Sequence, residues 1–287
     1  MQPRQLSFFA EQAQFSESTV SPERSSTFTD NMRLGVHRWF RYSAGFSARW
    51  VEDEIRAAMS TGPVRLLDPF AGAGTALLAA ECRGVAAIGI EAHPFVWRIA
   101  RAKLAWREPV EAFLGLARQV RLASGRRAGV PEGYPPIICK CYPPDVLAEL
   151  DALKNAWLSL SEPAAGNELV WLAITAILRP CSPAGTALWQ YVLPRKQKAN
   201  PLAPLAAYEM QVRRMAADMR AWNQHANSPR AGLVLGDARD YAQVPESWAT
   251  LVITSPPYTN NYDYAYAPLL EMAFWGDVVV WSDLQAK

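Results

Sequence analysis

The chain has 287 residues, half of them hydrophobic and a fifth charged, with a formal net charge of +2. This predicts one large α/β domain, or one domain with a sizeable insertion, around a packed core. No apolar run reaches the roughly 18 residues of a bilayer span, and residues 1–5 lack the apolar core of a signal peptide. We therefore expect a cytoplasmic protein with no membrane partner. The charge neither requires nor excludes nucleic acid, because a local patch decides that.

Residues 1–30 are rich in Ser, Gln, Glu and Thr without sustained periodicity, which predicts a flexible N-terminal arm. Within it, residues 5–9 read Gln-Leu-Ser-Phe-Phe and resemble the short peptide that binds the bacterial sliding clamp. Two aromatic anchors on such an arm would fill a preformed pocket. The alternative, favoured because five-residue matches arise easily, is that Leu6, Phe8 and Phe9 pack back on the parent domain.

Residues 31–104 carry the strongest local pattern. Residues 64–67 are apolar, as a central parallel strand should be, and lead into a turn with Gly72 and Gly74 and then a helix over 76–83. The two glycines leave the backbone of the turn without side chains, and the helix start offers free N–H groups, so a nucleotide-like ligand could approach closely. The next strand, 88–91, ends in Glu91, spaced to reach a ribose. Dehydrogenases have a wider Gly-x-Gly-x-x-Gly turn, which is absent here.

Upstream of that strand, Ser47 stands where a helix N-cap belongs, because Val51, Ile55 and Ala58 fall on one helical face. A capping role alone and a role at the ligand are about equally favoured for Ser47.

Residues 105–230 are longer than any ordinary link between two strands of such a sheet. Helices are expected at roughly 109–124, 145–160, 168–178 and 204–225, broken by Pro-rich turns, so we interpret the block as a helical insertion. Its basic residues suit a phosphate-gripping surface or an ordinary solvated face: Arg118, Arg121, Arg126, Arg127, Arg195, Lys196, Lys198, Arg213 and Arg214. Cys139 and Cys141 have no second Cys/His pair at ligand spacing, which predicts reduced thiols and no metal site.

Residues 231–287 begin with a strand, 232–235, followed by Asp237 at its carboxyl end. A second apolar strand, 249–253, is expected to be buried and runs into Thr254-Ser255-Pro256-Pro257-Tyr258. These two strands are expected on opposite sides of the strand that ends in Asp68. The order of strands then reverses beside that strand, and doubly wound sheets bind their ligands at such a switch point.

Asp68-Pro69-Phe70 before the glycine turn, together with Ser255-Pro256-Pro257-Tyr258, resembles the amino-methyltransferases, which use S-adenosylmethionine to methylate an exocyclic amino group of a DNA base. The resemblance covers about residues 45–104 and 232–275. It implies an α/β, Rossmann-like class I methyltransferase sheet with S-adenosyl-L-methionine as cofactor and DNA as partner. The cofactor-binding residues that it implies are Ser47, Asp68, Phe70, Gly72, Gly74, Thr75, Glu91 and Asp237. The catalytic residues that it implies are Ser255, Pro256, Pro257 and Tyr258.

The chemistry of that tetrapeptide is specific. The lone pair of an exocyclic amino group is delocalised into the ring, so the nitrogen is a poor nucleophile. A side-chain oxygen on Ser255 and the carbonyl of Pro256 can each accept one N–H, and consecutive prolines fix the backbone. Tyr258 can stack on the base, which must first leave the DNA helix.

Ser in the first place favours N4 of cytosine. The alternatives are N6 of adenine, a guanine amino group in structured RNA, and a catalytically silent DNA-binding subunit. Only residues 259–287 follow Tyr258, too few for the three further strands of the family fold. We therefore expect a truncated or split enzyme, lacking its C-terminal strands, that needs a second chain. The expected units are 1–30, 31–104, 105–230 and 231–287.

Overall fold

The computed structural model describes residues 28–42, 45–126, 129–130, 132–160, 166–186, 192–240, 242–257 and 267–278. Residues 1–27 of the predicted 1–30 arm, including the clamp-like peptide at 5–9, lie outside the described residues, as do Arg127 and Tyr258. The predictions for those segments stay predictions.

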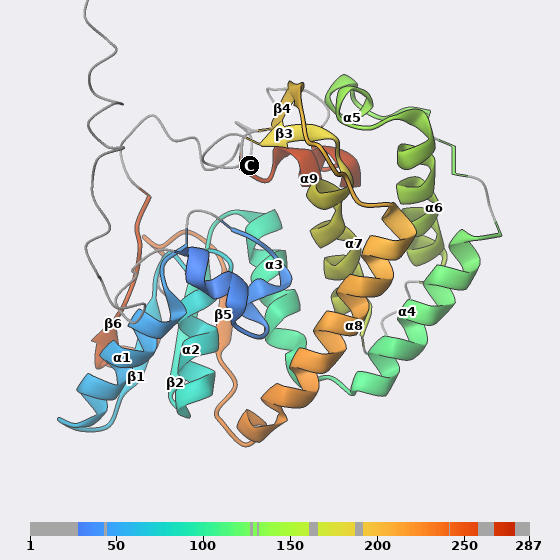
Figure 1. Cartoon of the computed structure of the whole chain (residues 1–287). Helices are drawn as coiled ribbons and strands as arrows, with labels where there is room; N and C mark the ends of the chain where they lie inside the picture. Colours follow the sequence, from blue (N-terminus) through green and yellow to red (C-terminus); the bar gives the residue numbers. More distant parts are fainter. Residues whose placement is uncertain are drawn as a thin grey trace, which may run out of the picture.

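A parallel sheet forms the centre of one half of the molecule (Figure 1). Its strand order is β5-β2-β1-β6, with β1 at Arg65–Asp68, β2 at Ala86–Glu91, β5 at Gly232–Leu235 and β6 at Leu251–Val252. All three pairings are parallel, so every strand ends at the same edge. The strands that precede Asp237 and Ser255 lie on opposite sides of β1, as predicted. This mixed α/β architecture fits a Rossmann-like methyltransferase.

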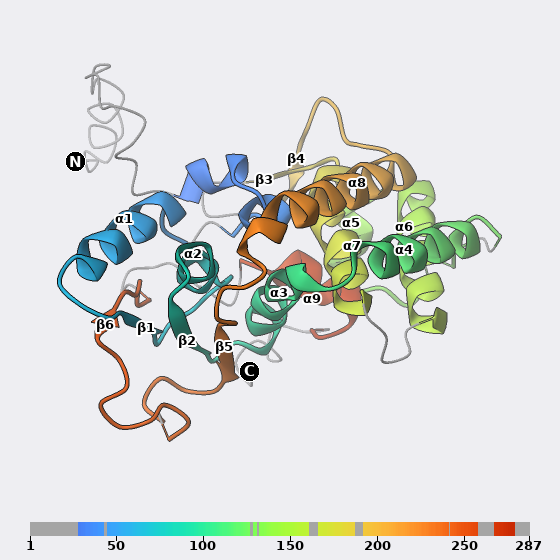
Figure 2. The same ribbon diagram turned by 90° about the horizontal axis from the view of Figure 1, so that it is seen from below.

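Two helices cover one face of the sheet (Figure 2). Val51 and Ile55 of α1 (Ala48–Met59) pack with Leu66 and Ile253. The same cluster contains four residues of α2 (Thr75–Arg83): Ala76, Leu77, Ala79 and Ala80. Gly89 lets α2 lie directly on β2, because a Cβ at this position would stand 2.8 Å from Leu77 Cδ1. Next to β5, α3 (Pro94–Leu104) completes this half.

The strand over 249–253 is shorter and more exposed than predicted. Only Leu251–Val252 form β6, and the Val252 side chain is 58% exposed. The reason is its place at an edge of the described sheet, where no further strand covers it. The predicted absence of C-terminal strands and the predicted second chain stay predictions.

The described parts of residues 105–230 pack beside the sheet as a helical block (Figure 1). The four expected helices form as α4 (Val110–Ser124), α6 (Pro144–Leu160), α7 (Asn167–Cys181) and α8 (Pro204–Trp222). Two features were not predicted: the short helix α5 (Pro136–Cys141) and an antiparallel pair of strands, β3 (Ala184–Thr186) and β4 (Val192–Gln197). The remaining elements are α9 (Leu269–Trp275) and the 3-10 helices η3 (Phe28–Arg33), η4 (His37–Trp39), η5 (Ala105–Arg107) and η6 (Asn223–His225).

Glu81 of α2 joins the two ends of the helical block. Its carboxylate, 1% exposed, accepts hydrogen bonds from Trp106 Nε1 at 2.6 Å and Arg107 Nη1 at 2.7 Å, where the block begins. It also accepts from the backbone N–H of Ala231 at 2.9 Å, where the block returns to β5. Arg107 donates to the carbonyls of His225 and Ser228 as well. We call these contacts the Glu81 clamp, and they hold β5 beside β2.

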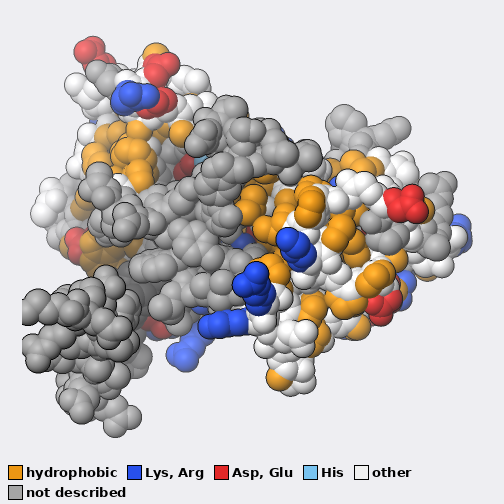
Figure 3. All heavy atoms as spheres, turned by 90° about the horizontal axis from the view of Figure 1, so that it is seen from above, with side chains coloured by type: hydrophobic (Ala, Val, Ile, Leu, Met, Phe, Trp, Pro, Cys, Tyr) orange, Lys and Arg blue, Asp and Glu red, His pale blue; other side chains and the backbone are white. Residues whose placement is uncertain are grey.

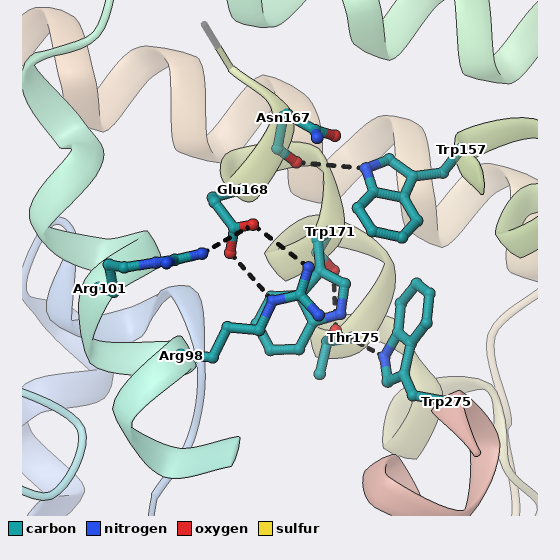
Figure 4. Close-up of polar contacts among 8 residues, drawn as sticks. All are labelled: Arg98, Arg101, Trp157, Asn167, Glu168, Trp171, Thr175 and Trp275. Carbon is teal, nitrogen blue, oxygen red and sulfur yellow. Dashed lines mark hydrogen bonds and ion pairs between the residues drawn. The ribbon is translucent and has the colours of Figure 1, made fainter. Parts of the chain in front are cut away.

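A second set of contacts joins α3, α7 and α9 (Figure 4). Glu168 of α7 accepts from Arg98 and Arg101 of α3, with N–O distances of 3.0 Å. Burial raises the pKa of Glu168, but these two arginines outweigh it, so the pKa lies below its usual value. The Arg98 guanidinium also lies 4.1 Å from the ring centre of Trp171. Trp275 of α9 donates to Thr175 of α7 at 3.0 Å.

Among the described residues, no helix is both long and apolar enough to cross a membrane. Within the same residues no group of His, Cys, Asp and Glu side chains could hold a metal ion. All four cysteines are free thiols in the structure.

Candidate active site

A cavity of about 540 Å³ opens at the carboxyl ends of the four parallel strands. This volume is within the roughly 300–1,000 Å³ range of small-molecule sites. The cavity brings together predicted site residues from all four strand ends: Phe70, Gly72, Thr75, Glu91, Asp237, Ser255 and Pro257. Tyr42, Phe46, His93 and Arg239 also line it.

The turn after β1 needs both of its glycines, for different reasons. Gly72 has φ +52° and lines the cavity, and a Cβ there would stand 3.3 Å from the Tyr42 ring. Gly74 has φ +82°, caps α2, and would place a Cβ 3.4 Å from Ala100 Cβ of α3. Gly74 therefore shapes the turn and its packing, whereas Gly72 forms the wall of the cavity.

Glu91 is fixed by the backbone around it. One carboxylate oxygen accepts from the N–H of Gly72 and the other from the N–H of His93, both at 2.8 Å. Burial raises the pKa of Glu91, and the N–H bonds oppose that effect. The backbone N–H of Ala92 bonds the same carboxylate. A carboxylate has about four acceptor positions, so one remains for a ligand hydroxyl.

Asp68 lies beneath the turn with 0% of its surface exposed. Its Oδ1 accepts from the N–H of Phe70 at 3.1 Å. Its Oδ2 and Thr254 Oγ1 are both buried without a hydrogen bond of good geometry. Burial raises the pKa of Asp68 to about 7, although the nearby Thr254 hydroxyl and the Phe70 N–H lower it. Asp68 thus couples the end of β1 to the Ser255 segment after β6.

Asp237 faces the cavity from the end of β5. Its carboxylate accepts from the backbone N–H and the guanidinium of Arg239, with the closest contact at 2.5 Å. The hydrogen bonds from Arg239 lower the pKa of Asp237 to about 2. The carboxylate is therefore ionised at neutral pH.

Four of the predicted site residues that the structure describes do not line the cavity. Asp68 is one of them, since it lies fully buried beneath the turn. Ser47 is buried as the N-cap of α1, where its hydroxyl accepts from the N–H of Trp50 at 3.4 Å. Gly74 lies behind the turn, and the exposed Pro256 lies outside the lining next to Ser255 and Pro257. The binding and catalytic roles of these residues stay predictions.

Comparison with known proteins gives one consistent result. The chain is 27% identical over 280 residues to the Type II methyltransferase M.AvaI of Nostoc sp. (strain PCC 7120) and of Anabaena variabilis, a match that covers 87% of this chain and 56% of each relative. It is 38% identical over 69 residues to the Type II methyltransferase M.BsoBI of Geobacillus stearothermophilus, covering 24% of this chain and 13% of the relative. The chain is similar to Type II methyltransferases.

The chain spans about half the length of the M.AvaI methyltransferases that it matches. No family model matches it. No solved structure matches it either.

The structure also places residues at the cavity that the sequence did not single out. Tyr42 and Phe46 line the cavity ahead of α1, and His93 lines it while capping α3. Phe46 and His93 stand just before a helix, a position that a single sequence does not separate from packing, and Tyr42 lies between η4 and α1 with no local signal. Arg239 and Thr254 stand next to predicted residues, but their partners Asp237 and Asp68 become visible only once side chains are placed.

Proposed function

We propose that this chain is an S-adenosylmethionine-dependent DNA amino-methyltransferase, with N4 of cytosine as the favoured target. The observation that carries the proposal is the single cavity that Gly72, Glu91, Asp237 and Ser255 line from four adjacent strand ends. The similarity to Type II methyltransferases supports methyl transfer in general.

The residues of the cavity fit S-adenosylmethionine. Glu91 and Asp237 offer carboxylate acceptors, and the only cation of the described lining, Arg239, is paired with Asp237. Such a site favours a ligand that carries positive charge, hydroxyls and an amino group. Glu91 would hold the ribose and Asp237 the adenine amino group. Gly72 would lie against the amino acid end, on which Asp68 would act through its charge from beneath the turn. When bound, the cofactor supplies an electrophilic methyl group on a positively charged sulfur.

The Ser255 segment would prepare the acceptor nitrogen. The Ser255 hydroxyl and the Pro256 carbonyl would each accept one N–H of the target amino group. These bonds favour a tetrahedral nitrogen whose lone pair is directed at the methyl group, so catalysis rests on positioning and oriented dipoles. The base must leave the duplex to reach this cavity.

The test is the identity of the methylated base. The protein is incubated with methyl-labelled S-adenosylmethionine and duplex DNA, alone and with the product of an adjoining gene, and the DNA is then digested to nucleosides. We expect label on N4 of cytosine. Label on N6 of adenine would replace the cytosine assignment with its alternative. Cofactor binding without transfer under both conditions would support the silent-subunit reading and contradict an active enzyme.

The pKa of Asp68 gives this site a measurable pH dependence. Because that pKa is raised to about 7, Asp68 is protonated in the free protein below neutral pH. The ionised form attracts the ammonium group of the ligand, so binding must release a proton at low pH. We expect cofactor affinity to fall by up to about tenfold for each pH unit below 7 and to level off above it. Titration calorimetry across this range measures the effect.

Asp68→Asn is the matched variant for this measurement, because the amide keeps the shape but cannot ionise. It should bind more weakly above pH 7 and lack the step in the pH profile. Parallel profiles for wild type and variant would mean that Asp68 does not titrate against the cofactor.

A further inference from the structure

A second cavity, of about 490 Å³, lies between η3, η4, α7 and α8, with Glu271 of α9 in its wall. We call it the basic cavity because cations dominate its charged lining: Arg38, Arg41, Arg179, Lys198 and Arg214. Apolar residues such as Met32, Leu202 and Met210 make up much of the rest. On the face seen from above, Lys and Arg side chains gather beside hydrophobic ones (Figure 3).

The carboxylates near the basic cavity do not cancel its charge. Glu271, 0% exposed, is held by Arg179 through two N–O contacts of 2.5 and 3.0 Å. Asp218, which lies outside the lining, accepts two hydrogen bonds from the Arg38 guanidinium. Lys198 Nζ donates to the backbone carbonyl of Arg179 at 2.6 Å, which brings the Lys198 ammonium group close to Arg179. The described lining therefore holds five cations and one carboxylate, and Arg41 and Arg214 are exposed at its rim.

The neighbouring groove between α4 and α8 is different. Arg121 pairs with Glu209 at 2.9 Å, Arg213 lies 3.8 Å from the same carboxylate, and Glu111 is also in the lining. Its cations and carboxylates are interspersed, as on an ordinary solvated helical face. Of the basic residues for which the sequence left two interpretations open, Arg118, Arg121 and Arg213 line this groove, and Lys198 and Arg214 line the basic cavity.

The basic cavity adjoins the candidate active site through consecutive residues of the chain. Tyr42 lines the active-site cavity, and Arg41, the residue before it, lines the basic cavity. A ligand in the basic cavity would therefore lie next to whatever occupies the active site.

We propose that the basic cavity binds a phosphodiester of the DNA backbone close to the target base. The arginines supply charge and N–H donors for phosphate oxygens, while the apolar wall suits the adjoining deoxyribose. This inference rests on the proposed function, since it names the part of the molecule that holds the substrate backbone. Held there, the backbone fixes the position of the duplex while the base enters the neighbouring cavity.

Arg214→Gln tests the site, with Arg213→Gln as the matched control. The two arginines are consecutive on α8, both are exposed, and each variant loses one charge, but Arg213 lines the other groove. We expect Arg214→Gln to bind a duplex oligonucleotide about eight-fold more weakly at 0.1 M salt, with a salt slope shallower by about 0.9. Arg41→Gln combined with Arg214→Gln should enlarge both effects, whereas Arg213→Gln should stay near wild type.

Thermal melting and cofactor binding show that each variant is folded, and inorganic phosphate is titrated in parallel. Equal DNA affinity and equal salt slopes for Arg214→Gln, the double variant and Arg213→Gln would overturn the phosphodiester site. Loss of inorganic phosphate binding alone, with DNA binding unchanged, would overturn it too. If wild type labels DNA while these variants bind it normally, only this inference fails. If wild type neither binds nor labels DNA, the proposed function fails with it.

Discussion

Replacing Glu91 with glutamine should weaken S-adenosylmethionine binding about 100-fold. Both carboxylate oxygens accept backbone N–H groups, from Gly72 and His93. An amide has only one oxygen, so its NH₂ must face one of these donors, and the wall of the cavity shifts. The ribose hydroxyls also lose a charged acceptor, and such bonds contribute about 1.5–3 kcal/mol each. A loss of about 1.4 kcal/mol is tenfold in affinity. Titration calorimetry with the cofactor measures the effect.

Glu54→Gln is the control for this experiment. It makes the same chemical change on an exposed position of α1, away from the cavity, and should leave affinity unchanged. Wild-type affinity in a folded Glu91→Gln protein would show that the cofactor does not use the end of β2. The nucleotide site would then have to be sought elsewhere.

The largest expected effect on stability belongs to the Glu81 clamp. Glu81→Ala leaves the Arg107 guanidinium, whose side chain is 7% exposed, without its carboxylate. It also removes the acceptor of Trp106 Nε1 and of the Ala231 N–H. Breaking a buried ion pair from one side costs about 3–5 kcal/mol. We expect a loss of that order in the free energy of unfolding, measured by chemical denaturation.

Asp53→Ala is the matched comparison, because it removes a carboxylate that pairs with Arg56 on the exposed face of α1. Exposed pairs contribute about 0–1 kcal/mol, so this variant should unfold close to wild type. Equal stabilities for Glu81→Ala and Asp53→Ala would mean that the two ends of the helical block are held together by packing alone.

The sequence predicted the sheet well where its signals are local. The apolar run into Gly72 and Gly74 specifies strand, turn and helix without reference to the rest of the chain. Helix α5 was missed because Pro135-Pro136 reads as a turn, although proline is tolerated at the first position of a helix, where Pro136 stands. The β3–β4 pair was missed because three-residue β3 carries no measurable alternation.

The site was predictable to the extent that it follows from topology. Glu91 ends a strand, and Asp237 and Ser255 each follow one. Because parallel strands end at one edge, the strand order alone predicts that these residues meet in one cavity. The couplings of Asp68 with Thr254 and of Asp237 with Arg239 depend on side-chain positions. The sequence could not decide the role of Ser47, since a capping pattern at a helix start is equally compatible with a ligand contact.

The Glu81 clamp also bears on the order in which the chain folds. The pairings of β2 with β5 and of β1 with β6 join residues far apart in the sequence, whereas the helical block is built largely from contacts between neighbouring segments. Local contacts form quickly, and long loops must be closed before distant strands gain anything from pairing. The block is therefore expected to assemble before Ala231 reaches Glu81. The cavity, which needs the ends of β5 and β6, is then completed in the last steps of folding.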